Sequence, residues 1–326
     1  MENKRNQHFV PQSYLRKFVI HGQKSLVWEF DKTTGRASID PVSVRKICSQ
    51  DFYYYQRTDT GKIDHTRLED AISQIEDIGI KIINSIRKPR NGIKVSLCEE
   101  KKGELSFYIA FLFARGPAIR NGIHELYAAI IQKKLASQYE SGALLDASPV
   151  LHDLVQKHGL FKLIRTEIFT NVSLPHIVEM ATILGQSMLA KRWTFYTPEN
   201  DQFFITSDNP VSYLLQPGLL SEPIGPAHQF SEVTIPLRKD LALVVSPTTN
   251  VPTTKDESEC VLLTATDTIV DAINRRTAAA ALRFFFSSYN SPKLLSLAQS
   301  VTGTSQRFTG DIVEEGTWRP VENPYK

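Results

Sequence analysis

The sequence predicts an α+β fold, in which a predominantly helical central block lies between N- and C-terminal parts that form a mixed or antiparallel β-sheet. Residues 1–60 combine a short helix with strand patterns, residues 61–192 show helical periodicity, and residues 193–326 return to strands with added helices. Strand-rich parts at both ends can join into one sheet. No Pro- or Ser-rich linker interrupts the chain, so we expect a single integrated domain over residues 1–326.

Composition narrows the class of protein. The 326 residues are 41% hydrophobic and 22% charged, as in ordinary globular proteins. Cys48, Cys98 and Cys260 form no CxxC pair, which argues against a disulfide framework and favours a reducing, cytoplasmic location. The most apolar run, residues 107–114, is far shorter than the roughly 20 residues that span a bilayer, so we expect no membrane partner. A net charge of +3 does not by itself predict a nucleic-acid partner.

The N-terminal part is expected to form strands after its short helix. Leu26, Trp28 and Phe30 alternate with polar neighbours, residues 31–36 have turn chemistry, and residues 52–55 are aromatic. These patterns predict a small β segment.

The central block is expected to be helical. Its first helix is predicted by apolar positions spaced by four and three residues, which mark one buried face, namely Leu68, Ile72, Ile75, Gly79, Ile82 and Ile86. Pro89 and Gly92 are expected to end it. Further helices are predicted at 99–115, from the break at Gly116-Pro117 to 139, at 151–169 and at 175–192, the last with Ser173 as a cap.

The C-terminal part is expected to alternate strands and helices. Strand patterns occur at 194–196, 202–206, 232–236 and 241–246, and helical patterns at 268–285 and 292–298. The sequence contains no P-loop, GxGxxG, HExxH or GxSxG motif. The sequence therefore does not predict a standard NTPase, dehydrogenase, zincin or hydrolase.

Three local features can carry chemistry. In the opening segment, Pro11 fits a helix start and Tyr14, Leu15 and Phe18 share one face. His8 precedes this helix, where an imidazole can serve as general base, metal ligand or structural hydrogen-bonding group. All three roles are consistent with the local pattern.

Glu69 and Glu76 lie on one side of the first long helix, seven residues apart. Carboxylates at the edge of a buried face can bind a metal, but two turns separate them by roughly 10.5 Å along the axis. The alternative is that they pair with basic residues such as Arg115.

The third feature is residues 204–211, where Asp208 follows an apolar strand. Such a carboxylate can be catalytic, or it can make an ordinary Asx turn before Pro210.

Together these features resemble the family called domain of unknown function 4238. The shared pattern comprises the segment His8–Phe18, Leu68-Glu69 and Ile75-Glu76, Arg115-Gly116-Pro117, Trp193, the turn Thr206–Pro210, Pro236-Leu237 and Asn274. The resemblance implies a bacterial origin and an association of some members with defence against bacteriophage.

On this basis we expect an anti-phage effector that cuts DNA or RNA. The expected catalytic residues are His8, Glu69, Glu76, Arg115 and Asp208, with Asp208 and Glu69 holding Mg²⁺ or Mn²⁺. The expected substrate-binding residues are Gln7, Tyr14, Asn209 and Asn274. The alternatives are a non-enzymatic sensor of a phage component, in which these residues form a structural network, and an enzyme acting on a nucleotide or another small molecule.

Overall fold

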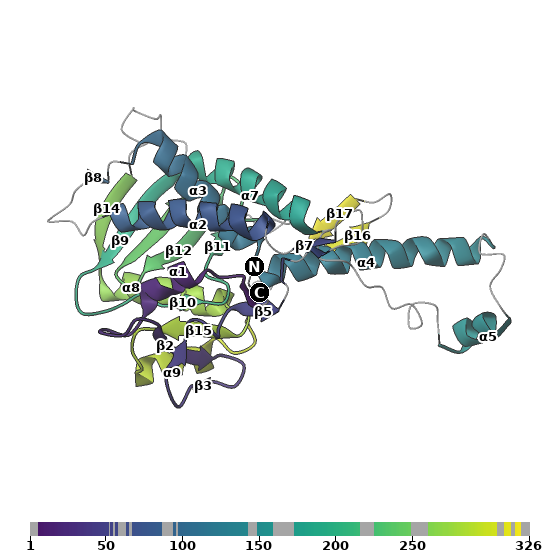
Figure 1. Ribbon diagram of the computed structural model, residues 1–326, viewed down its shortest axis with the longest axis horizontal. Coiled ribbons are helices and arrows are strands. Elements are labelled where there is room, and N and C mark those ends of the chain that lie inside the picture. Colours follow the sequence, from purple (N-terminus) through teal and green to yellow (C-terminus); the bar gives the residue numbers. More distant parts are fainter. Residues whose placement is uncertain are drawn as a thin grey trace.

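The structure is a computed structural model of the chain. It describes residues 6–51, 53–54, 56–57, 63–64, 67–86, 94–95, 97–142, 149–158, 173–215, 225–248, 260–304, 310–313 and 317–320. Helices and strands occur in the order that the sequence predicts, which confirms an α+β fold (Figure 1).

The larger sheet in the described part of the chain has six strands in the order β11-β12-β13-β9-β14-β8. β14 runs parallel to β9, and the other neighbours are antiparallel, so the sheet is mixed. The strands are β8 Lys94–Val95, β9 Arg192–Pro198, β11 Ser212–Leu215, β12 Ser231–Arg238, β13 Leu241–Ser246 and β14 Cys260–Ala265.

Helices cover both faces of this sheet, which explains the continuous apolar sequence of β13. Leu243 and Val245 belong to the main core, while Ala242 and Val244 belong to a separate core on the opposite face. Successive side chains of a strand point to opposite faces, so a strand buried on both faces is apolar throughout. Helices α2 (Arg67–Ser85), α3 (Glu99–Ala114) and α7 (Ser173–Leu189) cover the first face, and α8 (Asp267–Ala280) covers the second (Figure 1).

A second sheet joins the two ends of the chain, as expected. β2 (Leu26–Asp31) pairs antiparallel with β15 (Phe284–Ser287), and the Phe30 and Phe285 rings stack with centroids 4.9 Å apart. β3 (Arg36–Ala37), β4 (Val42–Ser43) and β10 (Thr206–Ser207) complete it. The ends of the chain therefore share this sheet, but the C-terminal part also builds most of the separate six-stranded sheet.

The first predicted helix is confirmed as α2. Ile72, Ile82 and Ile86 are buried, and Gly79 lies directly under the ring of Tyr108 from α3, where an added Cβ would be 2.3 Å from Cγ of that ring. Pro89 and Gly92, expected to end this helix, are outside the described residues.

The other predicted helices are confirmed with shifted ends. α4 spans Pro117–Glu140 and begins at the expected break, α5 spans Pro149–His158, and α9 spans Pro292–Ser300. Residues 159–169 of the predicted 151–169 helix are outside the described residues, and Ser173 is the first residue of α7. Beyond its first turns α4 is mostly exposed or half-buried, and it projects from the rest of the molecule with α5 beyond it (Figure 1).

Three boundary predictions are wrong. The helix predicted to reach residue 285 ends at Ala280, because Phe284 and the next residues pair with β2. In the segment predicted as a strand at 202–206, only Thr206 pairs, because the Asn274 side chain bonds Phe203 O and Ile205 N. The strand predicted at 52–55 ends earlier, at Asp51 of β5 (Ser49–Asp51).

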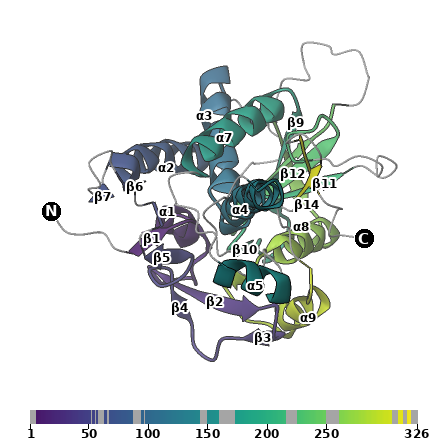
Figure 2. The ribbon, with the colours of Figure 1, turned by 90° about the vertical axis from the view of Figure 1, so that its right-hand side faces the viewer.

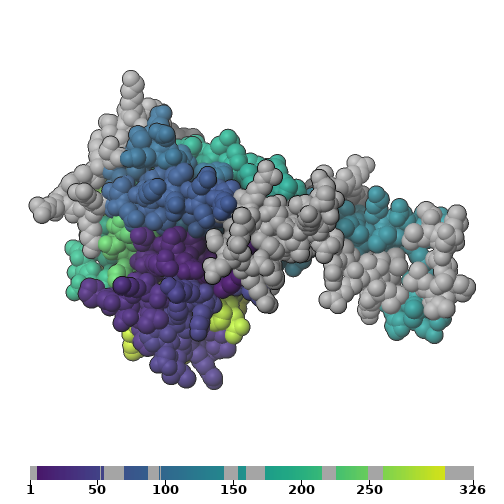
Figure 3. All heavy atoms as spheres, viewed as in Figure 1, coloured from purple at the N-terminus to yellow at the C-terminus, as the bar shows by residue number. Residues whose placement is uncertain are grey.

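The N-terminal segment lies between the six-stranded sheet with its helices and the second sheet. β1 (Asn6–His8) pairs with β5, and α1 (Gln12–Leu15) and the 3₁₀ helix η1 (Arg16–Phe18) follow (Figure 2). On the molecular surface this purple segment separates the blue helices α2 and α3 from the strands of the second sheet (Figure 3). Short hairpins pair β6 (Gln56–Arg57) with β7 (Ile63–Asp64) and β16 (Gly310–Val313) with β17 (Thr317–Pro320).

Among the residues that the structure describes, no helix combines the length and the apolar character that a membrane span requires.

Candidate functional site

Tyr14 fastens the N-terminal segment to the two sheets. Its side chain is fully buried, and its hydroxyl donates to the carbonyl of Pro236 at 2.5 Å while it accepts from the Thr206 hydroxyl at 3.0 Å. Burial raises the pKa of this hydroxyl well above its usual value. The opening motif and the Thr206–Pro210 turn therefore meet in space through Tyr14, and its buried, bonded hydroxyl fits a structural role.

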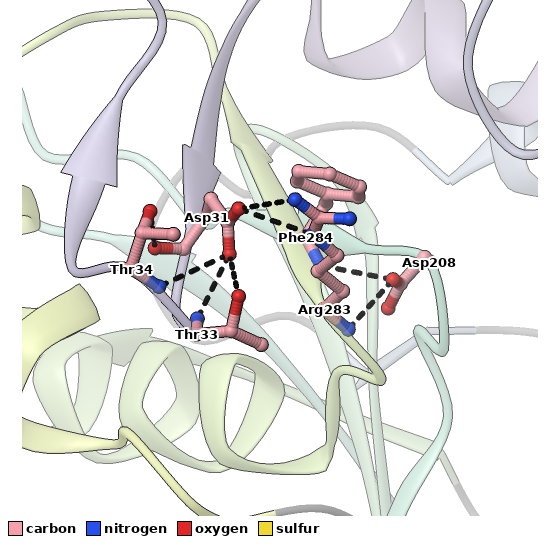
Figure 4. Close-up of polar contacts among 6 residues, drawn as sticks. All are labelled: Asp31, Thr33, Thr34, Asp208, Arg283 and Phe284. Carbon is pink, nitrogen blue, oxygen red and sulfur yellow. Dashed lines mark hydrogen bonds and ion pairs between the residues drawn. The ribbon is translucent and has the colours of Figure 1, made fainter.

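Asp208 binds the chain segment between α8 and β15. Its two carboxylate oxygens accept the backbone N–H groups of Leu282, Arg283 and Phe284 at 2.7 to 2.9 Å, whereas the Arg283 side chain turns away to Asp31 (Figure 4). Burial raises the pKa of the Asp208 carboxyl, and the three N–H donors oppose that rise. Both oxygens are engaged, as in an ordinary structural turn.

Asn209 and Asn274, the predicted substrate-binding residues of the C-terminal part, also bond the backbone. Asn209 donates from Nδ2 to the carbonyl of Ala280 at 2.9 Å. Asn274 accepts from Ile205 N and donates to Phe203 O, both at 3.0 Å. Both side chains are buried, so they hold α8 to the strand and turn at residues 203–209.

His8, Glu76 and Arg115 converge from three separate elements. Arg115, the C-cap of α3, is fully buried and forms an ion pair with Glu76 of α2 at 2.8 Å from Nη1 to Oε1. This confirms the predicted pairing. Both charges also act on the partly buried imidazole of His8. Burial would lower the pKa of Arg115, but Tyr54 and Glu76 outweigh burial and raise it, so the guanidinium is charged.

His8 is held as a neutral imidazole. Burial lowers its pKa, and the positive charges of Arg115 and Arg16 lower it further, whereas the Val44 backbone and Glu76 act in the opposite direction. A histidine with a lowered pKa is uncharged at neutral pH and can accept a proton.

Three tyrosines enclose this group, and sequence reasoning missed them. The Tyr53 hydroxyl donates to the carbonyl of Arg115 at 2.8 Å, and the Tyr54 hydroxyl donates to the carbonyl of His8 at 3.3 Å. Tyr108 lies against α2, and its hydroxyl is within the electrostatic reach of Arg115 and Glu76. The aromatic run at 52–55 is the available signal, but its β propensity predicts a strand and not a site.

Several polar atoms of this group have no hydrogen-bond partner among the described residues although they are buried. They are Gln7 Nε2, His8 Nε2, Tyr108 Oη, and Nε and Nη2 of Arg115. Burial raises the pKa of Tyr54, whose side chain lies beside the Arg115 guanidinium, and the charge of Arg115 opposes that rise. Gln7 uses its other end, Oε1, to accept from Tyr54 N at 2.5 Å. Buried polar atoms are usually paired, so several unpaired atoms in one place indicate a site for a ligand.

The structure thus separates the predicted site residues into two sets. Gln7, His8, Glu76 and Arg115 lie together, and we call them, with Tyr54 and Tyr108, the His8 cluster. Asp208 is instead bound to the backbone of residues 282–284, and it lies within the electrostatic reach of Lys32, Glu29 and Cys48. The side chain of Glu69 is outside the described residues. In the part of the chain that the structure describes, no three His, Cys, Asp or Glu side chains are grouped as a metal site requires.

Both sets contain residues from the motif recognised in the sequence. A family model matches residues 6–291, which is nearly all of the described part of the chain. The chain belongs to the family Protein of unknown function (DUF4238). No curated protein and no solved structure matches it significantly. For this DUF4238 member, the function is therefore argued from the geometry of the His8 cluster.

The titration of His8 gives a test of its burial in this DUF4238 protein. Because its native pKa is lowered, the unfolded chain takes up a proton at higher pH than the native protein does. Above the unfolded pKa of about 6.5, His8 is neutral in both states and its burial costs no stability. As the pH falls through that value, protonation favours the unfolded chain and the unfolding free energy decreases. We expect the unfolding free energy of the wild type to fall more steeply between about pH 7.5 and about pH 5.5 than that of His8→Gln. Equal slopes in denaturant titrations would contradict the burial.

Proposed function

We propose that this protein is a nuclease that acts in bacterial defence against phage, with the His8 cluster as its active site. The observation that carries the proposal is the convergence of His8, Glu76 and Arg115 from β1, α2 and the end of α3. A neutral imidazole can act as a general base and an arginine held by a carboxylate can stabilise a phosphate, so together these groups can promote phosphodiester cleavage. The association of some family members with phage defence supports the biological setting.

In this mechanism His8 acts as general base. It takes the proton from the attacking oxygen, which belongs either to water or, in RNA, to the adjacent 2′-hydroxyl. That oxygen forms a new P–O bond while the P–O bond to the leaving oxygen breaks, and the leaving oxygen takes up a proton from water as His8 returns its proton to water. Arg115 binds a phosphate of the substrate strand through the Nε and Nη2 edge that Glu76 leaves free, and its positive charge stabilises the negative charge that develops at the bond being cleaved. Glu76 holds the guanidinium in place from the other side.

The sequence predicts a divalent cation, but no step of this mechanism uses one. Asp208 uses both oxygens on backbone N–H groups, and the described residues offer no group of three His, Cys, Asp or Glu ligands. The described donor set therefore does not fit a Mg²⁺ or Mn²⁺ site, and the assay compares these ions with a chelator.

The proposal predicts that His8→Gln lowers the cleavage rate by about 10² to 10⁴, the usual effect of a general base, with little change in melting temperature. Purified protein would be incubated with plasmid, phage DNA and total RNA, with Mg²⁺, with Mn²⁺ and with EDTA. His21→Gln, which changes an exposed histidine outside the cluster, is the matched control and should cleave like the wild type. Intact substrates in every condition would contradict the nuclease proposal.

A second candidate is a non-enzymatic protein that recognises a phage component. It is favoured by the buried, bonded side chains of Tyr14, Asp208 and Asn274, which are typical of a polar network that holds a fold together. Under this alternative, His8→Gln protects cells against phage like the wild type. If the variant loses protection at an unchanged melting temperature, the active-site proposal is supported instead.

A further inference from the structure

We propose that the interior of the His8 cluster binds one compact anionic group, the terminal phosphate of a nucleotide or nucleic-acid strand. This inference rests on the proposed function, because it uses the same arginine, and it adds that the protein recognises strand ends rather than the interior of a strand.

The first argument is the set of unpaired donors. Nε and Nη2 of Arg115 form one edge of the guanidinium, and the opposite side is bound to Glu76. The Tyr108 hydroxyl and Gln7 Nε2 are also buried without a partner among the described residues. All of these groups can donate a hydrogen bond. A phosphate group offers several acceptor oxygens and matches the planar edge of an arginine.

The second argument is charge. Tyr53 and Tyr54 lie within the electrostatic reach of two cations, Arg115 and Arg120. Arg120 is buried, and its guanidinium donates to the backbone carbonyl of Tyr53. Among the described residues, Glu76 is the acidic group that acts on Tyr54. Two positive charges against one negative charge leave a surplus that favours an anion in a buried setting.

The third argument is that the donors are deeply buried, which favours a terminal phosphate over one inside a strand. Gln7 and Tyr108 are each 1% exposed and Arg115 is 0% exposed, whereas His8 is partly exposed and the Glu76 side chain is 20% exposed. A phosphodiester within a strand carries a nucleoside on both sides, and both would have to leave a buried site. A terminal phosphate has one attached nucleoside, which can lie toward the less buried His8 and Glu76, so that the next phosphodiester of the strand is the one placed at His8.

The first experiment measures phosphate binding without any cleavage. Inorganic phosphate, compared with chloride at equal ionic strength, should raise the melting temperature of the wild type in a saturable way. Tyr108→Phe should raise the phosphate concentration needed for half-saturation about tenfold or more, because it removes one donor to a charged group. In chloride this variant should be at least as stable as the wild type, since the lost hydroxyl had no partner.

The matched control is Ser106→Ala, on the same helix. The Ser106 hydroxyl is buried and donates to the carbonyl of Gly185 at 2.6 Å. Its removal should lower the melting temperature in chloride and leave the half-saturating phosphate concentration unchanged. If phosphate and chloride give the wild type the same melting temperature, or if Tyr108→Phe binds phosphate like the wild type, the inference is overturned.

The second experiment tests the strand end. Oligonucleotides of one sequence, with a 5′-phosphate, with a 3′-phosphate, with hydroxyl ends or circularised, would compete with inorganic phosphate. A phosphorylated end should compete at about a tenfold lower concentration than the other forms. Equal competition by all forms would overturn the strand-end assignment. Phosphate binding without cleavage would contradict the nuclease proposal alone, whereas cleavage without phosphate binding would overturn the inference alone.

Discussion

Replacing Asp208 with asparagine is expected to lower the free energy of unfolding by about 3 kcal/mol, measured by denaturant titration. The wild-type carboxylate accepts three backbone N–H groups through both oxygens. An asparagine keeps one acceptor oxygen and presents an NH₂ group to donors, so at least one backbone N–H is left unpaired in a buried place. Hydrogen bonds to a charged group contribute about 1.5 to 3 kcal/mol each.

Asp271→Asn is the matched control for this change. Asp271 lies on α8, and its side chain is 46% exposed in an ion pair with Lys293, so its replacement should change the stability by about 0.5 kcal/mol or less. If the Asp208→Asn protein instead melts like the wild type and has lost cleavage, the catalytic or metal-binding role expected from the sequence is supported.

Gly79→Ala is expected to destabilise the protein by about 3 kcal/mol, at the upper end of the range for overpacking a core. The new Cβ would lie 2.3 Å from Cγ and 2.6 Å from Cδ1 and Cδ2 of Tyr108, so the ring or the helices must move. Tyr108 and Glu76 belong to the His8 cluster, and any shift of α2 against α3 therefore also alters the ion pair between Glu76 and Arg115. Thermal unfolding and phosphate binding should both be impaired.

Gly103→Ala separates this clash from the intrinsic effect of glycine in a helix. Gly103 lies within α3, and an added Cβ there would have no atom within 4 Å. Alanine is a better helix former than glycine by about 1 kcal/mol, so this variant should be as stable as the wild type or more stable. If both alanine variants melt alike, the close packing of Gly79 on Tyr108 is contradicted.

Elements with a strong local pattern could be predicted from the sequence. The apolar face of α2 follows from its four-and-three spacing, and β13 was predicted with its correct ends, residues 241 and 246. β2 followed from the alternation of Leu26, Trp28 and Phe30. In each case the residues that decide the structure are neighbours in the chain.

Elements fixed by distant partners could not be predicted. Phe284 and Phe285 continue a helical pattern locally, yet they form β15 because β2 offers them a pairing edge. The backbone at residues 203–205 resembles a strand, but the side chain of Asn274 takes the bonds that a neighbouring strand would. Nothing local to either segment reveals these partners.

The candidate site was predicted in part for the same reason. The pairing of Glu76 with Arg115 follows from the opposite charges that the motif contains. Asp208 has the same local features whether it binds a metal or a backbone segment, so its neighbours at residues 282–284 could not be inferred. The unpaired hydroxyl of Tyr108 becomes visible only when α2 and α3 are packed.

The anchoring of Tyr14 at Pro236, and of β2 on β15, sets an order of events during synthesis. All members of the His8 cluster belong to the first 115 residues and leave the ribosome early, but the strands that fix their supports are translated much later. A nascent chain that stops before residue 284 has an unpaired edge on β2. Contacts of such long sequence separation form slowly, so we expect an assembled cluster only after nearly the whole chain has been made.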